Sequence, residues 1–224
     1  MKSASSQLKP ASAILYWRLP KLRFAASYSN LQMRDQIRRE IEAIKPFDML
    51  ESEHQAEALA WVDSGAPLFR VTKPATPPKH LVSYFAVVDG LHILLVDHKN
   101  AMLWLPAGGH VEPQEHPRAT VVRELEEELG FVATHAIGTP LMITCTSTVG
   151  LTAGHTDVTL WYVVQANREE PLKYDESEFN AVQWFPLAEV PVQRADPHLH
   201  RFIAKLRSNS IATPPQAGRG GWVR

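Results

Sequence analysis

The stretch that decides this chain runs from Gly108 to Phe131 and reads GGHVEPQEHPRATVVRELEEELGF. Glutamates far outnumber arginines in it, although the whole 224-residue chain carries a formal net charge of only -1. Acidic helices are common on protein surfaces, so the spacing of these glutamates decides whether they have a chemical role.

The spacing predicts a helix from His116 to Leu129. Pro117 suits the first helical position and Gly130 suits the position just past the end. Apolar residues recur three and four positions apart and are expected to form the buried stripe: Val122, Leu125 and Leu129.

Three acidic residues, Glu124, Glu127 and Glu128, share a neighbouring face of this helix by the same spacing. Like charges so close together repel one another, and a cation would offset that cost. Ligand sets made only of oxygen select hard cations such as Mg²⁺ or Mn²⁺. Arg123 lies beside the carboxylates and can form a bidentate pair, with Glu115 as its partner. The preceding glycine pair lets the backbone approach a ligand. The pattern therefore favours metal-assisted chemistry on a phosphate.

The longer spacing resembles the Nudix box at every defined position: Gly109, five residues, Glu115, seven residues, Arg123-Glu124-Leu125, one residue, Glu127-Glu128, one residue, Gly130-Phe131. The approach from Trp104 to Gly109 is similar to that of the family, with Pro106 one place earlier than in many members. Weaker similarity extends from about His80 to Leu206.

The resemblance implies an α+β fold, a Nudix-type α/β/α sandwich around a mixed β-sheet, here with an N-terminal helical extension. It implies hydrolysis of a phosphoanhydride bond in a nucleoside diphosphate linked to another group, with a nucleoside triphosphate as the default substrate. Mg²⁺, or Mn²⁺ as a substitute, would be held by Glu124, Glu127 and Glu128, assisted by the Gly109 carbonyl. Catalytic roles fall to Glu127, Glu128 and Arg123, and either of those glutamates can serve as base.

Several other residues are candidates for the same site. Glu178 lies six residues before Trp184, where some members carry a further glutamate, although a solvated surface charge explains it equally well. Substrate contacts are expected from four residues, whose alternatives are an exposed loop, a strand-edge polar pair and apolar packing: His110, His155, Asp157 and Trp104. A nucleotide-binding regulatory module without hydrolysis is the alternative function.

The rest of the chain divides into parts. Residues 1–33 form a basic extension, to be read as a transit peptide, a disordered tail or an early start with Met33 as the true one. Residues 34–78 form a lead segment with two helices, the first buried through its isoleucines and the second capped by Ser52, followed by a proline-rich connector. Residues 79–206 form the Nudix domain, and residues 207–224 a flexible tail.

Within that domain, we expect a hairpin about Asp89-Gly90, further strands in 141–150, 157–166 and 179–190, and a last helix in 198–208. The near-neutral charge gives no field for nucleic acid or a membrane, and no apolar run approaches the length of about 20 residues that a membrane helix needs. A single cysteine, Cys145, excludes an intramolecular disulfide and fits the cytoplasm. The expected partner is a nucleotide-type small molecule, and a homodimer is compatible.

Overall fold

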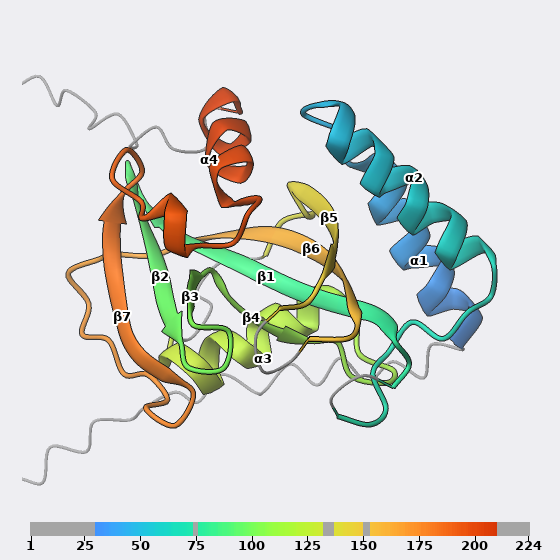
Figure 1. The fold of residues 1–224 in the computed structure, drawn as a ribbon, viewed down its shortest axis with the longest axis horizontal. Coiled ribbons are helices and arrows are strands. Elements are labelled where there is room, and N and C mark those ends of the chain that lie inside the picture. The colour runs from blue at the N-terminus through green and yellow to red at the C-terminus, as the bar shows by residue number, and fades with distance from the viewer. Residues whose placement is uncertain (1–29, 74–75, 132–136, 150–152, 210–224) are drawn as a thin grey trace, which may run out of the picture.

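The computed structural model describes residues 30–73, 76–131, 137–149 and 153–209 (Figure 1). Most of the predicted basic extension and most of the predicted tail lie outside these residues. The helices are α1 (Asn30–Ala43), α2 (Met49–Asp63), α3 (Pro117–Leu129) and α4 (Leu199–Ser208), with a short 3-10 turn η2 (Val192–Arg194). The strands are β1 (Lys79–Asp89), β2 (His92–His98), β3 (Leu103–Leu105), β4 (Ala107–His110), β5 (Met142–Ser147), β6 (Thr156–Gln165) and β7 (Phe179–Pro186).

The strands of the described residues form one seven-stranded mixed sheet in the order β3-β2-β1-β6-β5, with β4 paired to β1 and β7 paired to β2. β1 and β6 run parallel over ten residue pairs, whereas every other pairing is antiparallel. The predicted hairpin is confirmed, because Gly90 turns the chain between β1 and β2 with a φ of 56°. Both layers of helices pack on the long central strands.

Alternate residues of the central strands feed two separate cores, as the two-residue period of a strand requires. In β1, Phe85 and Val87 face the core shared with α1, α2 and α3, whereas Ala86 and Val88 face the core shared with α4. α3 and α4 lie on opposite sides of the sheet (Figure 1). The structure is therefore the expected α/β/α sandwich.

α3 has the predicted ends, with Pro117 in its first turn and Gly130 in the left-handed conformation at φ 65°. Its buried stripe differs from the prediction by one position. Val121 is fully buried, whereas Val122 is 43% exposed. Val121, Leu125 and Leu129 are spaced by four residues, so they follow the contact line with the sheet, and Val122 falls outside it.

The two lead helices are part of the same core. Ile37, Ile41 and Ile44 are buried as predicted. α1 begins at Asn30, before the expected boundary at residue 34, and Met33 is buried in the same cluster. α1 and α2 therefore pack on the core of the sheet, and the predicted division of the chain at residues 78 and 79 stays a prediction.

α2 begins four residues earlier than its predicted cap at Ser52 implies. Asp48 caps the helix by accepting a hydrogen bond of 2.9 Å from the Glu51 amide, and Ser52 lies inside the first turn. The Glu51 side chain accepts a hydrogen bond of 2.7 Å from the amide of Phe47. Asp48 is therefore the cap residue, and the predicted cap at Ser52 is wrong.

The same end of α2 is attached to α4 by ion pairs. The ammonium of Lys205 lies 2.6 Å from the fully buried Glu51 carboxylate, and Arg201 donates to Asp48 at 2.8 Å. These contacts join helices that lie far apart in the sequence. They couple the first described part of the chain to the last helix.

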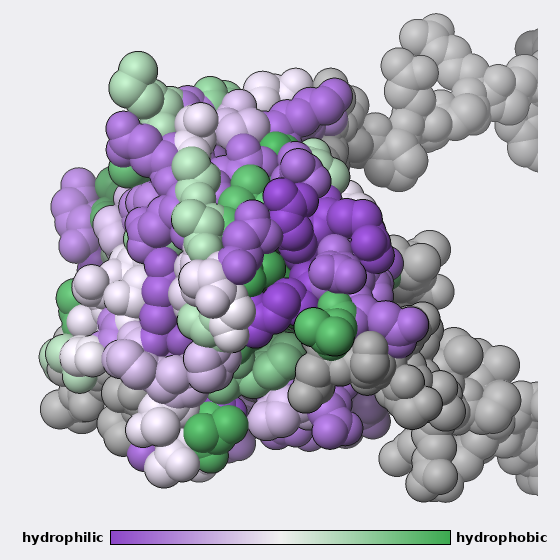
Figure 2. All heavy atoms as spheres, turned by 90° about the vertical axis from the view of Figure 1, so that its right-hand side faces the viewer, coloured by the Kyte–Doolittle hydropathy of each residue, from purple (hydrophilic) through white to green (hydrophobic). Residues whose placement is uncertain are grey.

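The outward face near α1 and α2 is mainly hydrophilic, and apolar side chains are scattered over it (Figure 2). Leu31 and Met49 are among the exposed apolar residues of these helices. No helix among the described residues combines the length and apolar character needed to cross a membrane.

Candidate functional site

The glycine pair is positioned by the pairing of β4 with β1, where Gly109 lies opposite Ser83 and Gly108 opposite Tyr84. Gly108 has a φ of 159°, and a Cβ there would meet the Ser83 carbonyl oxygen at 2.3 Å. Gly109 faces α3, and a Cβ on it would lie 1.9 Å from Oε1 of Glu124. The absence of side chains lets β4 and the acidic helix approach each other directly.

Arg123 holds the carboxylates around this contact. Its Nε and Nη2 each lie 3.0 Å from the two oxygens of Glu115, which is the predicted bidentate pair. Its Nη1 donates to Glu124 at 2.6 Å and to Glu127 at 3.3 Å. Nη2 also donates to the His110 carbonyl at 3.3 Å. One guanidinium thus fixes three carboxylates relative to the loop.

The three glutamates of α3 differ in environment. Glu128 is buried and accepts a hydrogen bond of 3.1 Å from the Gly108 amide. Burial, reinforced by the charges of Glu124 and Glu178, raises its pKa to about 9. Burial also raises the pKa of Glu124. Glu127 has a side chain that is 61% exposed. The cluster therefore combines two partly desolvated carboxylates with one that reaches solvent.

Glu178 is exposed on the turn that precedes β7. The turn is attached to α3, because the Asp175 amide donates to the backbone carbonyl of Glu128 at 3.1 Å. The charge of Glu178 contributes to the raised pKa of Glu128, so the two carboxylates are electrostatic neighbours. The position agrees with a fourth carboxylate beside the cluster, and its role stays a prediction.

Three of the expected substrate residues, His110, His155 and Asp157, lie together in a second group. His80 lies in the same group, although no sequence motif marks it. His80 is the second residue of β1 and pairs with Asp157 of β6. This parallel pairing could not be predicted from the local sequence. Burial, with the charge of Arg70 as the next cause, lowers the pKa of His110 to about 2.

Trp104 does not join either group. Its ring packs edge-on against Phe185 at a centroid distance of 5.0 Å, with Arg194 5.9 Å above it. These contacts belong to the core beneath α4. Packing accounts for Trp104 in this structure, and stacking on a base remains a prediction.

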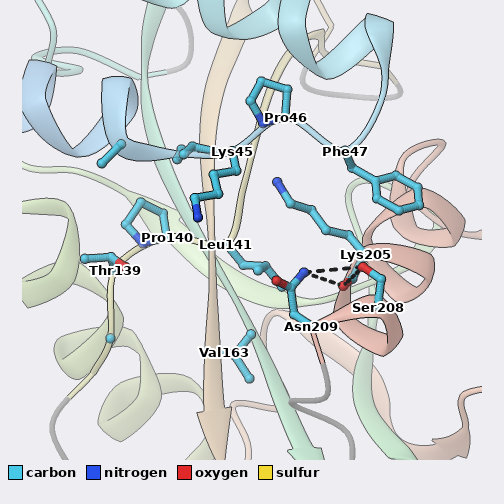
Figure 3. A pocket seen from close by; sticks show the side chains of 13 residues that line it. Lys45, Pro46, Phe47, Thr139, Pro140, Leu141, Val163, Lys205, Ser208 and Asn209 are labelled. Carbon is cyan, nitrogen blue, oxygen red and sulfur yellow. Dashed lines mark hydrogen bonds between the residues drawn. The ribbon is translucent and has the colours of Figure 1, made fainter.

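A cleft of about 540 Å³ lies elsewhere, between the α1–α2 connection, residues 138–141 and the end of α4 (Figure 3). Lys45, Pro140 and Lys205 line it. The ammonium of Lys205 is engaged by Glu51, and burial lowers its pKa. None of the glutamates of α3 lines this cleft, so its volume does not locate the chemistry.

Comparison with known proteins adds an independent finding. A family model described as the NUDIX domain matches residues 79–206. No curated protein matches the chain. Among solved structures, the MutT NUDIX hydrolase from Burkholderia pseudomallei is 23% identical with a TM-score of 0.49, covering 57% of this chain and 98% of that one. The E. coli ORF135 protein is 28% identical with a TM-score of 0.44, covering 60% and 94%. A C. elegans Ap4A hydrolase is 15% identical with a TM-score of 0.48, covering 58% and 97%.

Proposed function

Because the chain belongs to the NUDIX hydrolase family, we propose that it is a Mg²⁺-dependent enzyme that cleaves a phosphoanhydride bond. The substrate class is a nucleoside diphosphate linked to another group, which includes nucleoside triphosphates. The observation that carries this proposal is the contact between Gly109 and Glu124, with Glu127 and Glu128 on the same helix.

The residues present fit a hard divalent cation. The donors of the acidic helix are carboxylate oxygens, and the backbone of Gly109 lies directly beneath Glu124. Burial and neighbouring carboxylates raise the pKa of Glu128 to about 9, so its ionised form is costly without a cation. Glu124, Glu127 and Glu128 would hold Mg²⁺, with the Gly109 carbonyl assisting. Bound Mg²⁺ supplies Lewis-acid stabilisation of the charge on the diphosphate and lowers the pKa of a bound water.

The chain's own residues supply position and proton transfer. Arg123 keeps Glu115, Glu124 and Glu127 in one arrangement through the hydrogen bonds of its guanidinium. Glu127 or Glu128 accepts the proton of the attacking water. The exposure of Glu127 favours it as the residue that passes this proton on to solvent. Glu178 stands near Glu128 as a further acceptor. Water attacks one phosphorus, the bridging oxygen leaves with the other phosphate, and the proton passes to a carboxylate.

We include a cytoplasmic location in this proposal, supported by the single cysteine of the chain. The proposed partner is the nucleotide-type small molecule that serves as substrate. Burial raises the pKa of the Cys145 thiol to about 12, which keeps it a thiol rather than a reactive thiolate. A homodimer stays a prediction.

The test is a hydrolysis screen of the full chain on a panel of nucleoside triphosphates, dinucleoside polyphosphates and nucleotide sugars. Each compound is incubated with Mg²⁺ and with EDTA, and the products are separated by chromatography. We expect the chain to cleave at least one compound in the presence of Mg²⁺ and none in the presence of EDTA. If the chain binds panel compounds and cleaves none, it is a regulatory module that has kept the fold.

A further inference from the structure

The second group of polar residues has a composition unlike that of the acidic helix. We propose that His80, His110, His155 and Asp157 form a second metal site, suited to a transition ion of the Zn²⁺ type. One ligand atom from each of the four lies within 4.8 Å of all the others. The proposal concerns an ion separate from the Mg²⁺ of the proposed hydrolysis.

The fold brings these residues together from three adjacent strands. The parallel register of β1 and β6 sets His80 against Asp157, and His155 directly precedes β6. β4 pairs with β1 so that His110 lies opposite Val82. Because successive side chains of a strand point to opposite faces, His110 turns away from the face on which Gly109 meets Glu124. The two groups are therefore built on opposite faces of one short strand.

Hydrogen bonding fixes the tautomer of His80. Its Nδ1 lies 2.8 Å from the carbonyl oxygen of Pro77, which only accepts, so Nδ1 carries the proton. In the neutral ring, Nε2 therefore presents a lone pair, and it lies 3.3 Å from Oδ1 of Asp157. Both of these atoms are buried, neither has a hydrogen-bond partner among the described residues, and the His80 residue is fully buried. Two acceptors facing each other require a cation or a proton between them.

His155 repeats this arrangement. The Thr148 hydroxyl can donate to the His155 carbonyl at 3.2 Å, which leaves its oxygen to accept from Nδ1 of His155 at 3.2 Å. The Nε2 of His155 then presents its lone pair to Oδ1 of Asp157 at 3.3 Å. In protein metal sites, a ligating histidine characteristically donates its other ring proton to a carbonyl or another oxygen. Pro77 and Thr148 provide that outer shell.

His110 supplies a third nitrogen. The guanidinium of Arg70 lies 3.0 Å from Nε2 of His110, and because arginine only donates, that nitrogen also presents a lone pair. The same Nε2 lies 3.9 Å from Oδ1 of Asp157. Arg70 is thus a cation in direct contact with the group, from a segment without regular secondary structure. It would have to move aside for a metal, and the two compete.

The ligand set defines the class of ion. Three imidazole nitrogens and one carboxylate oxygen suit Zn²⁺, which takes four such ligands in a tetrahedral arrangement. Mg²⁺ prefers oxygen and keeps several waters, so an imidazole-rich pocket disfavours it. His80 and His155 are 0% and 5% exposed, so they have little surface with which to touch a nucleotide directly.

The full chain, stripped with a chelator, is titrated with Zn²⁺ in competition with a chromophoric chelator, and separately with Co²⁺ followed by visible absorption. One equivalent of Zn²⁺ is expected, with the intense visible bands of tetrahedral Co²⁺. Asp157→Asn and His155→Asn should each weaken Zn²⁺ binding by about tenfold or more. His200→Asn, an exposed histidine of α4, is the control and should leave the affinity unchanged. Arg70→Gln should raise it, because the competing cation is gone.

Glu127→Gln separates this site from the acidic helix. It should leave the affinity for Zn²⁺ unchanged, whatever its effect on hydrolysis. Melting curves of the stripped variants establish that each one folds, and a variant that does not fold is replaced by Arg70→Gln, which leaves all four ligands in place. Absence of Zn²⁺ binding, an affinity that Arg70→Gln fails to raise, or binding lost in Glu127→Gln but kept in Asp157→Asn would each overturn the proposal. In those cases the four residues are held together by protons and Arg70 without a metal.

Discussion

Replacing Gly109 with alanine tests how closely β4 approaches the acidic helix. The new Cβ would lie 1.9 Å from Oε1 and 2.3 Å from Cδ of Glu124. To reach an ordinary contact of 3.4 Å, the carboxylate must retreat by about 1.5 Å. The carboxylate is the far end of a flexible side chain, so the fold should tolerate the change with a small loss of stability.

The effect on catalysis should be much larger than the effect on stability. Glu124 would leave its position beside Arg123, which now donates to it at 2.6 Å. Misplacing a catalytic group by about 1 Å can cost roughly 10²-fold in rate, or about 2.7 kcal/mol of barrier. We therefore expect kcat of Gly109→Ala to fall by about 10²-fold, with Tm within a few degrees of the wild type.

The assay is kcat at saturating Mg²⁺ on the substrate found in the hydrolysis screen, together with Tm. Gly138→Ala is the control, because a Cβ there meets no atom of the described residues within 4 Å. Glu124→Asp shortens the side chain by about 1.5 Å, so adding Gly109→Ala to it should cost little more, and the two changes should not be additive. A wild-type kcat in Gly109→Ala, or full additivity in the double variant, would refute the close contact.

Three further predictions follow from the charged groups. Burial raises the pKa of Glu128 from 4.5 to about 9. Without metal, the protonated carboxyl therefore contributes its full stabilisation of the folded state below pH 4.5, and this contribution is lost as the pH rises to about 9. Mg²⁺ should therefore raise Tm more at pH 9 than at pH 5, and equal shifts in melts with and without EDTA would contradict this. Lys205→Met should lower the free energy of unfolding by about 3–5 kcal/mol, because the buried Glu51 carboxylate loses its cation. Urea unfolding measures this loss, and a value below about 1 kcal/mol would show that the ion pair does not hold α2 in place. Glu178→Gln should lower kcat by about tenfold at saturating Mg²⁺ while Glu176→Gln leaves it near wild type, and equal rates would reduce the first to a surface charge.

The features predicted correctly from sequence depend on local chemistry. Pro117 and Gly130 define the ends of α3 because each favours one backbone conformation at one helix position. The pair between Arg123 and Glu115 was predictable because its two residues lie on one helix and the loop before it. The acidic cluster rests on the periodicity of a single helix, so its members could be grouped without knowing the fold.

The features that were missed depend on contacts across the chain. Val121 is buried instead of Val122 because the position of the sheet, rather than helical spacing alone, sets the rotation of α3. The cap at Asp48 competes with the equally plausible Ser52, and the attachment of Asp48 to Arg201 of α4 favours the earlier start. His80 meets Asp157 through a parallel pairing whose register is fixed by the whole sheet.

The most direct test of the proposed hydrolysis compares two neighbouring glutamates of α3. Glu127→Gln removes a carboxylate that Arg123 holds at 3.3 Å, whereas Glu126→Gln makes the same chemical change at an exposed position one residue earlier. At saturating Mg²⁺, kcat should fall by about 10²-fold or more in Glu127→Gln and stay near wild type in Glu126→Gln. Hydrolysis by Glu127→Gln at the wild-type rate would contradict the assignment of the acidic helix as the metal-binding and catalytic element.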